Sequence, residues 1–301
     1  MHCTPCTPPR CPICERPGRP RRSAFDRYAL YACPECTLEF LHPQPDASVL
    51  ASIYGADYFL GEQDDAAAKR RSRMKSATGA LYIDAIARTV HPDQLELLEI
   101  GCGHGEVLME ARRRGFLVSG LEVSGHAAST ANDYLGELAV HAGSLETAPF
   151  TADRFGAVLA ADVIEHVPDP QAFLVEIRQL LSPGGVLLLV TPSLDSWTRR
   201  VMRSHWMEYK VEHLFYFSAA AMRLLLERCG FYEIRILPNR KVLTIDYICR
   251  HFDRFRVPLL STLAGLLRRL VPERLAHRHL LVPASGLMAI ARKSAEPRPS
   301  R

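Results

Sequence analysis

From residue 95 onward, short apolar segments alternate with helix-like segments, and this alternation constrains the fold more than any other feature of the sequence. Strands are expected over seven apolar segments, at 95–100, 117–122, 138–142, 156–162, 186–191, 231–237 and 287–291. Several of the intervals between them carry apolar residues at helical spacing. Strands and helices that alternate through short connections build βαβ units with parallel strands. The sequence therefore predicts an α/β protein with a doubly wound, mostly parallel sheet.

The composition is that of a globular protein. The chain has 301 residues, enough for about two domains. Its 48% hydrophobic and 23% charged residues argue against wholesale disorder. The net charge of +4 is weak evidence for a polyanionic partner, because only five of the 37 basic residues are lysine and an arginine bias can arise from the coding sequence. The first residues lack the apolar core of a signal peptide, and no apolar run is long enough to span a membrane, so we expect a cytoplasmic protein.

A glycine-rich turn, Gly101-Cys102-Gly103-His104-Gly105, follows the first expected strand. In an open α/β sheet, ligands bind beyond the carboxyl ends of the strands, near the turn into the first helix. Glycines let the backbone approach a ligand closely, and the free N–H groups favour an anionic group. This turn predicts a small-molecule site at that edge of the sheet.

The spacing of the glycines distinguishes between nucleotide cofactors. A dinucleotide fingerprint needs a glycine where this chain has Glu106, and a phosphate loop with lysine is also lacking. NAD, FAD and nucleoside triphosphates are therefore disfavoured. Glu122, at the end of the second strand, is placed to accept hydrogen bonds from two ribose hydroxyls; the alternative is a solvated carboxylate at a strand end.

Four segments in order, 98–105, 120–124, 161–167 and 181–186, resemble the motifs of class I S-adenosylmethionine-dependent methyltransferases. The resemblance covers roughly residues 46–237. It implies a seven-stranded, Rossmann-like sheet whose last strand is antiparallel. It also implies an enzyme that binds S-adenosylmethionine and moves its methyl group by in-line displacement.

The resemblance further implies which residues contact the methionyl and ribose parts of the cofactor. Glu99 is expected to orient the amino group, and Glu122 to bind the ribose beside Val123. The backbone of the glycine turn is expected to line the methionyl part, through Gly101, Cys102, Gly103 and Gly105.

Contacts to the adenine and to the methyl-transfer face are implied in the same way. Ser144 and Leu145 are expected to flank the adenine, although the family usually has an aspartate at the position of Ser144. Asp162, Val163 and Ile164 are expected to line the methyl-transfer face. Tyr54 either closes over the cofactor or packs within the helical segment around it.

Six of the nine cysteines lie in the first 36 residues as three pairs with two residues between their members. Cys11/Cys14 and Cys33/Cys36, with eighteen residues between the pairs, have the spacing of a zinc site. Four thiolates fill a tetrahedral shell, so this zinc would be structural. Disulfides are the alternative, disfavoured by the absence of an export signal. Cys3 and Cys6 are a spare pair, a competing ligand pair or a frayed start.

The chain is expected to divide into a head, a linker, a main domain and a tail. Residues 1–45 would form a zinc-ribbon-like head, 46–94 a helical linker, 95–293 the cofactor-binding domain and 294–301 a disordered tail. Such a head is similar to that of a subset of these methyltransferases, whose acceptors are often small molecules or saccharide-linked compounds. Residues 238–285 would be an insertion, in which 258–271 form an amphipathic lid or core helix, or one that contacts a membrane surface.

Two histidines are candidate general bases. His166 follows the fourth strand at the ligand edge, and His213 precedes a helix on the carboxyl side of the fifth. Alignment of the nucleophile, carbon and sulfur supplies about 7–11 kcal/mol, and a base matters only when the acceptor must lose a proton. For each histidine, a structural role with hydrogen-bonded ring nitrogens is the alternative.

The function predicted from these features is methylation of a small-molecule or saccharide-linked acceptor. One alternative is an RNA methyltransferase that holds RNA with the zinc ribbon and the basic run 69–75. Another is a binding protein with a degenerate cofactor site. No DNA partner is expected, and the acceptor, the methylated atom and the oligomeric state do not follow from the sequence.

Overall fold

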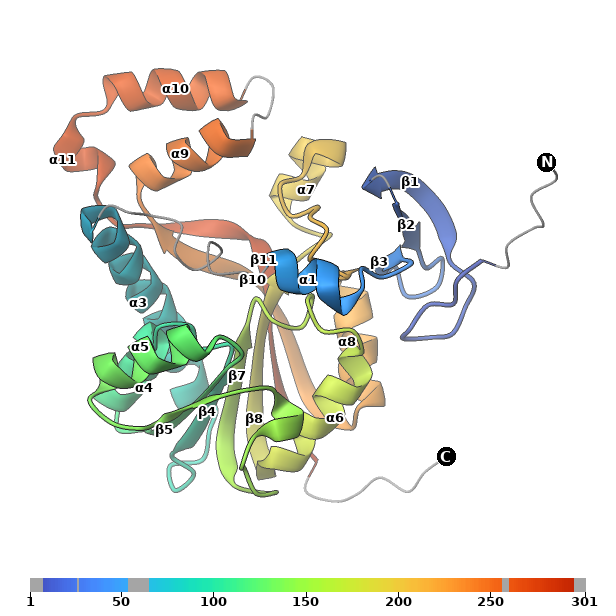
Figure 1. Ribbon diagram of the computed structural model, residues 1–301, viewed down its shortest axis with the longest axis vertical. Coiled ribbons are helices and arrows are strands. Elements are labelled where there is room, and N and C mark those ends of the chain that lie inside the picture. Colours follow the sequence, from blue (N-terminus) through green and yellow to red (C-terminus); the bar gives the residue numbers. More distant parts are fainter. Residues whose placement is uncertain (1–7, 26, 54–64, 256–259, 295–301) are drawn as a thin grey trace.

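The computed structural model describes residues 8–25, 27–53, 65–255 and 260–294. A seven-stranded sheet flanked by helices forms the main body, and a four-stranded ribbon lies beside it at the N-terminal end (Figure 1). Within the described parts of the chain, no helix has the length and apolar character needed to cross a membrane.

The main sheet has the strand order β10-β11-β8-β7-β4-β5-β6. Its strands are β4 (Glu96–Ile100), β5 (Leu117–Glu122), β6 (Val140–Ala142), β7 (Phe155–Ala161), β8 (Leu181–Pro192), β10 (Phe231–Leu243) and β11 (Leu280–Lys293). β4 pairs in parallel with β5 and β7, whereas β11 runs antiparallel to both β8 and β10. The predicted doubly wound sheet with an antiparallel last strand is confirmed.

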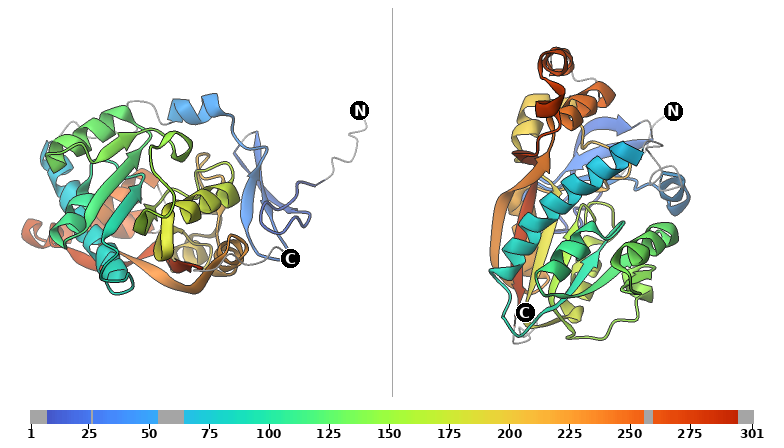
Figure 2. Two further views of the ribbon diagram at one scale, coloured as in Figure 1. Left: turned by 90° about the horizontal axis from the view of Figure 1, so that it is seen from below. Right: turned by 90° about the vertical axis from the view of Figure 1, so that its left-hand side faces the viewer.

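Helices cover both faces of this sheet. One face carries α3 (Asp65–Ala87), α4 (Glu106–Arg113) and α5 (Gly125–Leu135), and the other carries α6 (Pro170–Leu180) and α8 (Ala219–Arg228). Figure 2 shows α3 lying along the sheet. In β4, Leu97 packs in the core on the α3 side, and Leu98 and Ile100 pack in the core on the α6 side. Alternate residues of a strand point to opposite faces, so this continuous apolar strand is buried on both.

The ribbon is an antiparallel sheet that the main body completes. Its strands are β1 (Arg19–Phe25), β2 (Tyr28–Ala32), β3 (Glu39–His42) and the short β9 (Phe215–Tyr216), in that spatial order. β9 comes from the segment just before α8 and pairs with β3. Leu38 and Phe40 of the ribbon also share one buried cluster with Phe215 and Phe217. The sequence indicated neither β9 nor most of β1.

The β10–β11 hairpin is longer than the strands expected at 231–237 and 287–291. The register shifts between Pro238 and Arg240, and pairing then continues to Leu243 opposite Leu280. Pro238 suggested a strand end, but a bulge accommodates it. Three helices connect the far ends of this hairpin and project from the main body (Figure 1): α9 (Ile245–Phe255), α10 (Leu260–Leu270) and α11 (Glu273–Ala276).

The remaining elements are short. They are α1 (Ala47–Ile53), α7 (Trp197–Met202) and two 3-10 turns, η1 (Leu145–Thr147) and η2 (Arg203–His205).

Candidate functional site

The glycine turn after β4 has a backbone that requires glycine. Gly101, Gly103 and Gly105 have φ angles of +72°, +55° and +82°. A Cβ on Gly101 would also lie 2.6 Å from Cγ2 of Val163, in the turn after β7. Both the left-handed conformation and the close approach exclude larger residues at Gly101. The turns after β4 and β7 therefore meet at the carboxyl edge of the sheet.

The carboxylate of Glu122 joins this turn to the end of β5. Its Oε2 accepts a hydrogen bond from the Gly103 amide at 2.9 Å, and its Oε1 accepts one from the Ser124 amide at 3.0 Å. Glu122 is only 4% exposed. Each carboxylate oxygen has a second lone pair, so Glu122 can still accept hydrogen bonds from ligand hydroxyls.

Glu99, at the end of β4, is a buried carboxylate with an unsatisfied oxygen. Burial raises its pKa well above the ordinary value, and the nearby Glu106 raises it further. Its Oε2 has no hydrogen-bond partner among the described residues. Such an atom is costly to bury, and a donor from a bound ligand would satisfy it.

Lys75, on α3, was not among the predicted site residues. Its positive charge partly offsets the effect of burial, which still keeps the pKa of the Glu99 carboxyl well above the ordinary value. Its Nζ lies 3.9 Å from the position that a Cβ on Gly103 would occupy. In the sequence Lys75 belongs to the basic run 69–75, and only tertiary packing brings it to the glycine turn.

The other predicted cofactor residues differ in their placement. Val123 is 72% exposed just after β5. Ser144 and Leu145 follow β6, where Ser144 caps η1 and Leu145 is the first residue of that turn. Ile164 is fully buried in the core. Tyr54 lies outside the described residues.

The two predicted base candidates come together beyond β7. The rings of His166 and His213 have centroids 4.7 Å apart and planes 80° apart. Burial lowers the pKa of His166, and it lowers the pKa of His213 well below the ordinary value. Both imidazoles are therefore neutral at pH 7, and each has one ring nitrogen with a lone pair.

Two charged residues near these histidines were not predicted. Glu165 is 1% exposed, and burial raises its pKa to about 8. It belongs to the 161–167 motif, so its position next to His166 was the available indication. Lys241 of β10 forms an ion pair with Asp162, with Nζ and Oδ2 2.8 Å apart. Lys241 lies in the segment that the sequence assigned to an insertion.

The four predicted zinc ligands converge in the ribbon. The Sγ atoms of Cys11 and Cys36 are 3.5 Å apart, those of Cys14 and Cys33 are 3.3 Å apart, and those of Cys14 and Cys36 are 3.8 Å apart. Thiolates on a tetrahedral zinc ion lie about 3.8 Å from one another, whereas disulfide sulfurs are about 2.05 Å apart. A hydrogen bond from Cys36 lowers the pKa of the Cys11 thiol to about 5. The cluster therefore fits a zinc ion. Cys3 and Cys6 lie outside the described residues.

Each cysteine pair is followed by a residue in a left-handed conformation. Glu15 has a φ angle of 62° and Thr37 one of 64°. The amide of each donates to the carbonyl of the first cysteine of its pair, at 2.9 Å for Glu15 and 3.2 Å for Thr37. Both turns therefore place a residue with a Cβ in a backbone conformation that only glycine adopts without strain.

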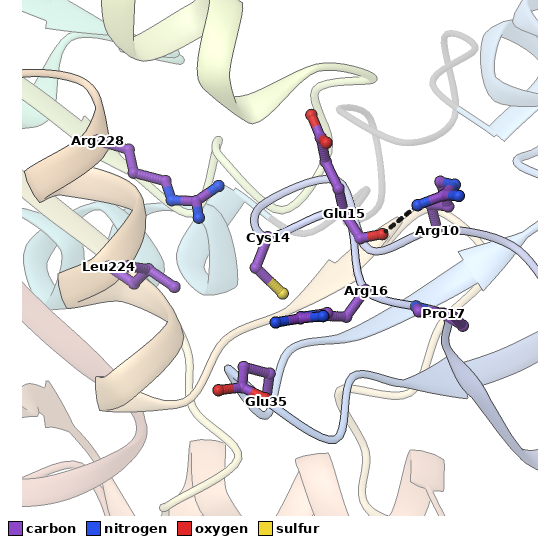
Figure 3. A pocket seen from close by; sticks show the side chains of 8 residues that line it. All are labelled: Arg10, Cys14, Glu15, Arg16, Pro17, Glu35, Leu224 and Arg228. Atoms are coloured by element: carbon purple, nitrogen blue, oxygen red, sulfur yellow. Dashed lines mark hydrogen bonds between the residues drawn. The ribbon is translucent and has the colours of Figure 1, made fainter. Parts of the chain in front are cut away.

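A hollow of about 500 Å³ lies beside the cysteine cluster (Figure 3). It is lined by residues of the ribbon and α8, namely Arg10, Cys14, Glu15, Arg16, Pro17, Glu35, Leu224 and Arg228. None of the described cofactor candidates lines it. The hollow therefore does not include the glycine turn at the carboxyl edge of the main sheet.

A family model described as "Methyltransferase domain" matches residues 69–235, more than half of the chain. The chain belongs to this methyltransferase family. The matched residues include the glycine turn, Glu122 and the turn after β7. The resemblance to class I S-adenosylmethionine-dependent methyltransferases is confirmed.

Curated relatives match part of this methyltransferase. The ubiquinone biosynthesis O-methyltransferase of Caulobacter sp. (strain K31) is 35% identical over 105 residues, which are 32% of this chain and 40% of that protein. The protein of the same name from Parvibaculum lavamentivorans (strain DS-1 / DSM 13023 / NCIMB 13966) is 31% identical over 127 residues, 40% of this chain and 50% of that protein. The chain thus spans half the length of these relatives or less.

A solved structure supports the fold of the methyltransferase. A chain from the complex between the Haloferax volcanii Trm112 methyltransferase activator and a methyltransferase superposes with a TM-score of 0.55. It is 17% identical, and the match covers 81% of this chain and 97% of that one.

Proposed function

We propose that this protein transfers the methyl group of S-adenosylmethionine to an oxygen atom of a small-molecule or saccharide-linked acceptor. The observation that carries the proposal is the unpartnered Oε2 of Glu99, two residues before a turn whose glycines at positive φ present no side chain of their own. The transfer to oxygen is supported by the curated relatives, which are named O-methyltransferases.

The residues around the glycine turn fit the amino-acid end of the cofactor. Glu99 would hold the amino group, and Lys75 would hold the carboxylate as its counter-ion. Glu122 would accept hydrogen bonds from the two ribose hydroxyls, while Ser144 and Leu145 would flank the adenine. When bound, S-adenosylmethionine supplies an activated methyl carbon on a sulfonium centre.

The acceptor would lie on the side of the crevice where Asp162, His166 and His213 are found. These residues would orient the acceptor, and a neutral imidazole can take the proton of a hydroxyl group. Holding the acceptor oxygen in line with the methyl carbon is the larger contribution, about 7–11 kcal/mol.

The ribbon would hold a structural zinc ion through its four cysteine thiolates, with no position open for chemistry. Zinc quantified on the purified protein tests this part. About one zinc per chain, lost when Cys11 and Cys36 are both replaced by serine, is expected. Reduced cysteines without metal would contradict it.

Calorimetric titration with S-adenosylmethionine tests the proposed function. We expect one binding site per chain, and transfer of labelled methyl groups from the cofactor to a small-molecule fraction of cell extract. If labelled RNA forms instead, and binding to it weakens steeply with salt, the RNA alternative is correct. If the cofactor does not bind, the proposal is wrong.

A further inference from the structure

We infer that Glu165, His166 and His213 form a second metal site, which takes a divalent first-row transition ion next to the acceptor. One ligand atom from each of these residues lies within 4.8 Å of those from the other two. The three residues come from two segments, the turn after β7 and the segment before β9. The chain therefore converges on this point by tertiary folding.

Two of the three residues present an unsatisfied atom here. Oε1 of Glu165 and Nδ1 of His213 are both buried, and neither has a hydrogen-bond partner in the described part of the chain. The residues themselves are 1% and 4% exposed. Glu165 and His213 belong to one cluster of potential ligands, and two unsatisfied polar atoms buried in it are costly unless another group binds them. A carboxylate oxygen and an imidazole nitrogen both carry lone pairs. In a site that excludes water, a proton or a metal cation can bind to both.

Neighbouring groups orient each ligand, as is usual around protein-bound metals. Thr191 Oγ1 donates to Oε2 of Glu165 at 2.9 Å, which fixes this carboxylate and leaves Oε1 as its unpartnered oxygen among the described residues. Nδ1 of His166 lies 2.9 Å from the Glu212 carbonyl, and a carbonyl only accepts, so the lone pair of the neutral ring is on Nε2. The backbone of Glu208 hydrogen-bonds the His213 ring, while Nδ1 of His213 has no partner among the described residues.

The ligand set selects the class of ion. Two imidazoles and one carboxylate suit zinc, iron(II), cobalt(II) or manganese(II) better than magnesium or calcium, which prefer an all-oxygen shell. Three protein ligands leave at least one position for an exogenous oxygen, in contrast to the closed shell of the four cysteines. The charged neighbours are mixed, with Asp162 paired to Lys241, and Lys210 and Glu208 also close enough to act on these residues.

This inference rests on the proposed function, which it deepens by assigning how the acceptor loses its proton. The acceptor hydroxyl would bind the cation, which lowers its pKa, and the O–H bond would break with the proton passing to solvent water. The oxygen lone pair would then form the bond to the methyl carbon. The carbon–sulfur bond would break with its electron pair remaining on the sulfur. With the ion bound, the histidines would hold it through their lone pairs, and proton loss to solvent water would replace the direct transfer of the proton to an imidazole.

The test is a titration with cobalt(II) of the full-length protein, purified with its ribbon zinc in place. We expect one additional equivalent of cobalt per chain, with visible absorption and no sulfur-to-cobalt charge-transfer band. In Glu165→Gln and His213→Ala the dissociation constant for cobalt should rise at least tenfold. His205→Ala, which removes an exposed histidine from η2, is the matched control and should bind like wild type.

Several outcomes would overturn the inference. They are no additional equivalent in wild type, affinity unchanged in both variants, or full methyl transfer after removal of all metal except the ribbon zinc. If a variant loses its far-UV circular dichroism, the wild-type stoichiometry and spectrum still decide. S-adenosylmethionine is titrated into the same samples. Cofactor binding without cobalt binding would contradict the metal site alone. Absence of cofactor binding would contradict the proposed function.

Discussion

The hydroxyl groups of Thr37 and Ser218 lie 2.6 Å apart and form a hydrogen bond, although 181 positions separate them in the chain. Thr37 ends the second cysteine turn of the ribbon, and Ser218 caps the first turn of α8. The ribbon is therefore attached to the main body at the start of this helix. β9 and His213 lie immediately upstream, so the head and the proposed acceptor side share one short segment.

Replacing Glu15 with glycine should stabilise the zinc-loaded protein by about 1 kcal/mol, because the left-handed conformation at Glu15 strains any residue with a Cβ. Thr37→Gly relieves the same strain but also loses the hydrogen bond to Ser218, worth about 1 kcal/mol, so it should be close to neutral. Urea unfolding of both variants measures the difference. Destabilisation by Glu15→Gly would show that this turn is not strained.

Stability of the cofactor-free protein should depend on pH through Glu99. Burial raises the pKa of this carboxyl above its unfolded value of about 4.3, so its contribution to stability is present below that value and is lost as the pH rises. Glu99→Gln does not titrate. The variant should therefore gain stability relative to wild type between pH 5 and 7.5, by up to about 1.4 kcal/mol per pH unit. Urea unfolding at both pH values checks this, and parallel pH profiles would contradict it.

Glu122→Ala should raise the dissociation constant for S-adenosylmethionine at least tenfold. The variant loses the hydrogen bonds to the ribose and frees the amides of Gly103 and Ser124, and each bond to a charged group is worth about 1.5–3 kcal/mol. Glu273→Ala, on the exposed α11, is the control and should bind like wild type. Calorimetry measures both, and equal affinities would remove Glu122 from the cofactor site.

His213→Ala should lower turnover at least tenfold and leave the affinity for S-adenosylmethionine near that of wild type. The His213 ring packs beside His166 and Tyr216, whereas the cofactor is proposed to bind at the glycine turn. Steady-state kinetics with the acceptor identified by labelling, together with cofactor titration, separates the two effects. Unchanged turnover would leave His213 with a purely structural role.

The exposed leucines of α10 are consistent with the predicted membrane contact, which can be tested. Leu263, Leu266 and Leu270 are 55%, 54% and 71% exposed, and Arg268 and Arg269 lie in the last turn. Residues 258 and 259 of the predicted segment 258–271 lie outside the described residues. A double variant, Leu263→Gln with Leu270→Gln, should reduce co-sedimentation with anionic lipid vesicles severalfold.

A control for this experiment comes from the main domain. Leu138 is 95% exposed far from α10 in sequence, and Leu138→Gln should sediment like wild type. Failure of the wild-type protein to sediment with vesicles would show that α10 has another role, such as a lid.

The sequence predicted best those elements in which local pattern and tertiary packing agree. The strand expected at 117–122 has these limits in the structure, because its apolar run ends at a charged residue where the sheet also ends. Asp169 and Ser218 cap helices as their residue types suggest, each accepting hydrogen bonds from backbone amides of the first turn.

Other parts depend on contacts that no local pattern encodes. β9 has two residues and exists only because β3 lies beside it. Lys241 follows a proline that normally ends a strand, and a bulge carries the chain past it to Asp162. The proximity of Glu165 to His213 likewise needs both segments folded, so the sequence suggested the two histidines separately and missed the carboxylate near them.

Because Phe40 and Glu39 of β3 pair with Phe215 and Tyr216, the head lacks a complete sheet of its own. A chain beginning near residue 46 would leave the backbone of β9 without its neighbour and expose aromatic side chains that are now buried. During evolution, such a head could be exchanged between enzymes only together with the strand that receives it.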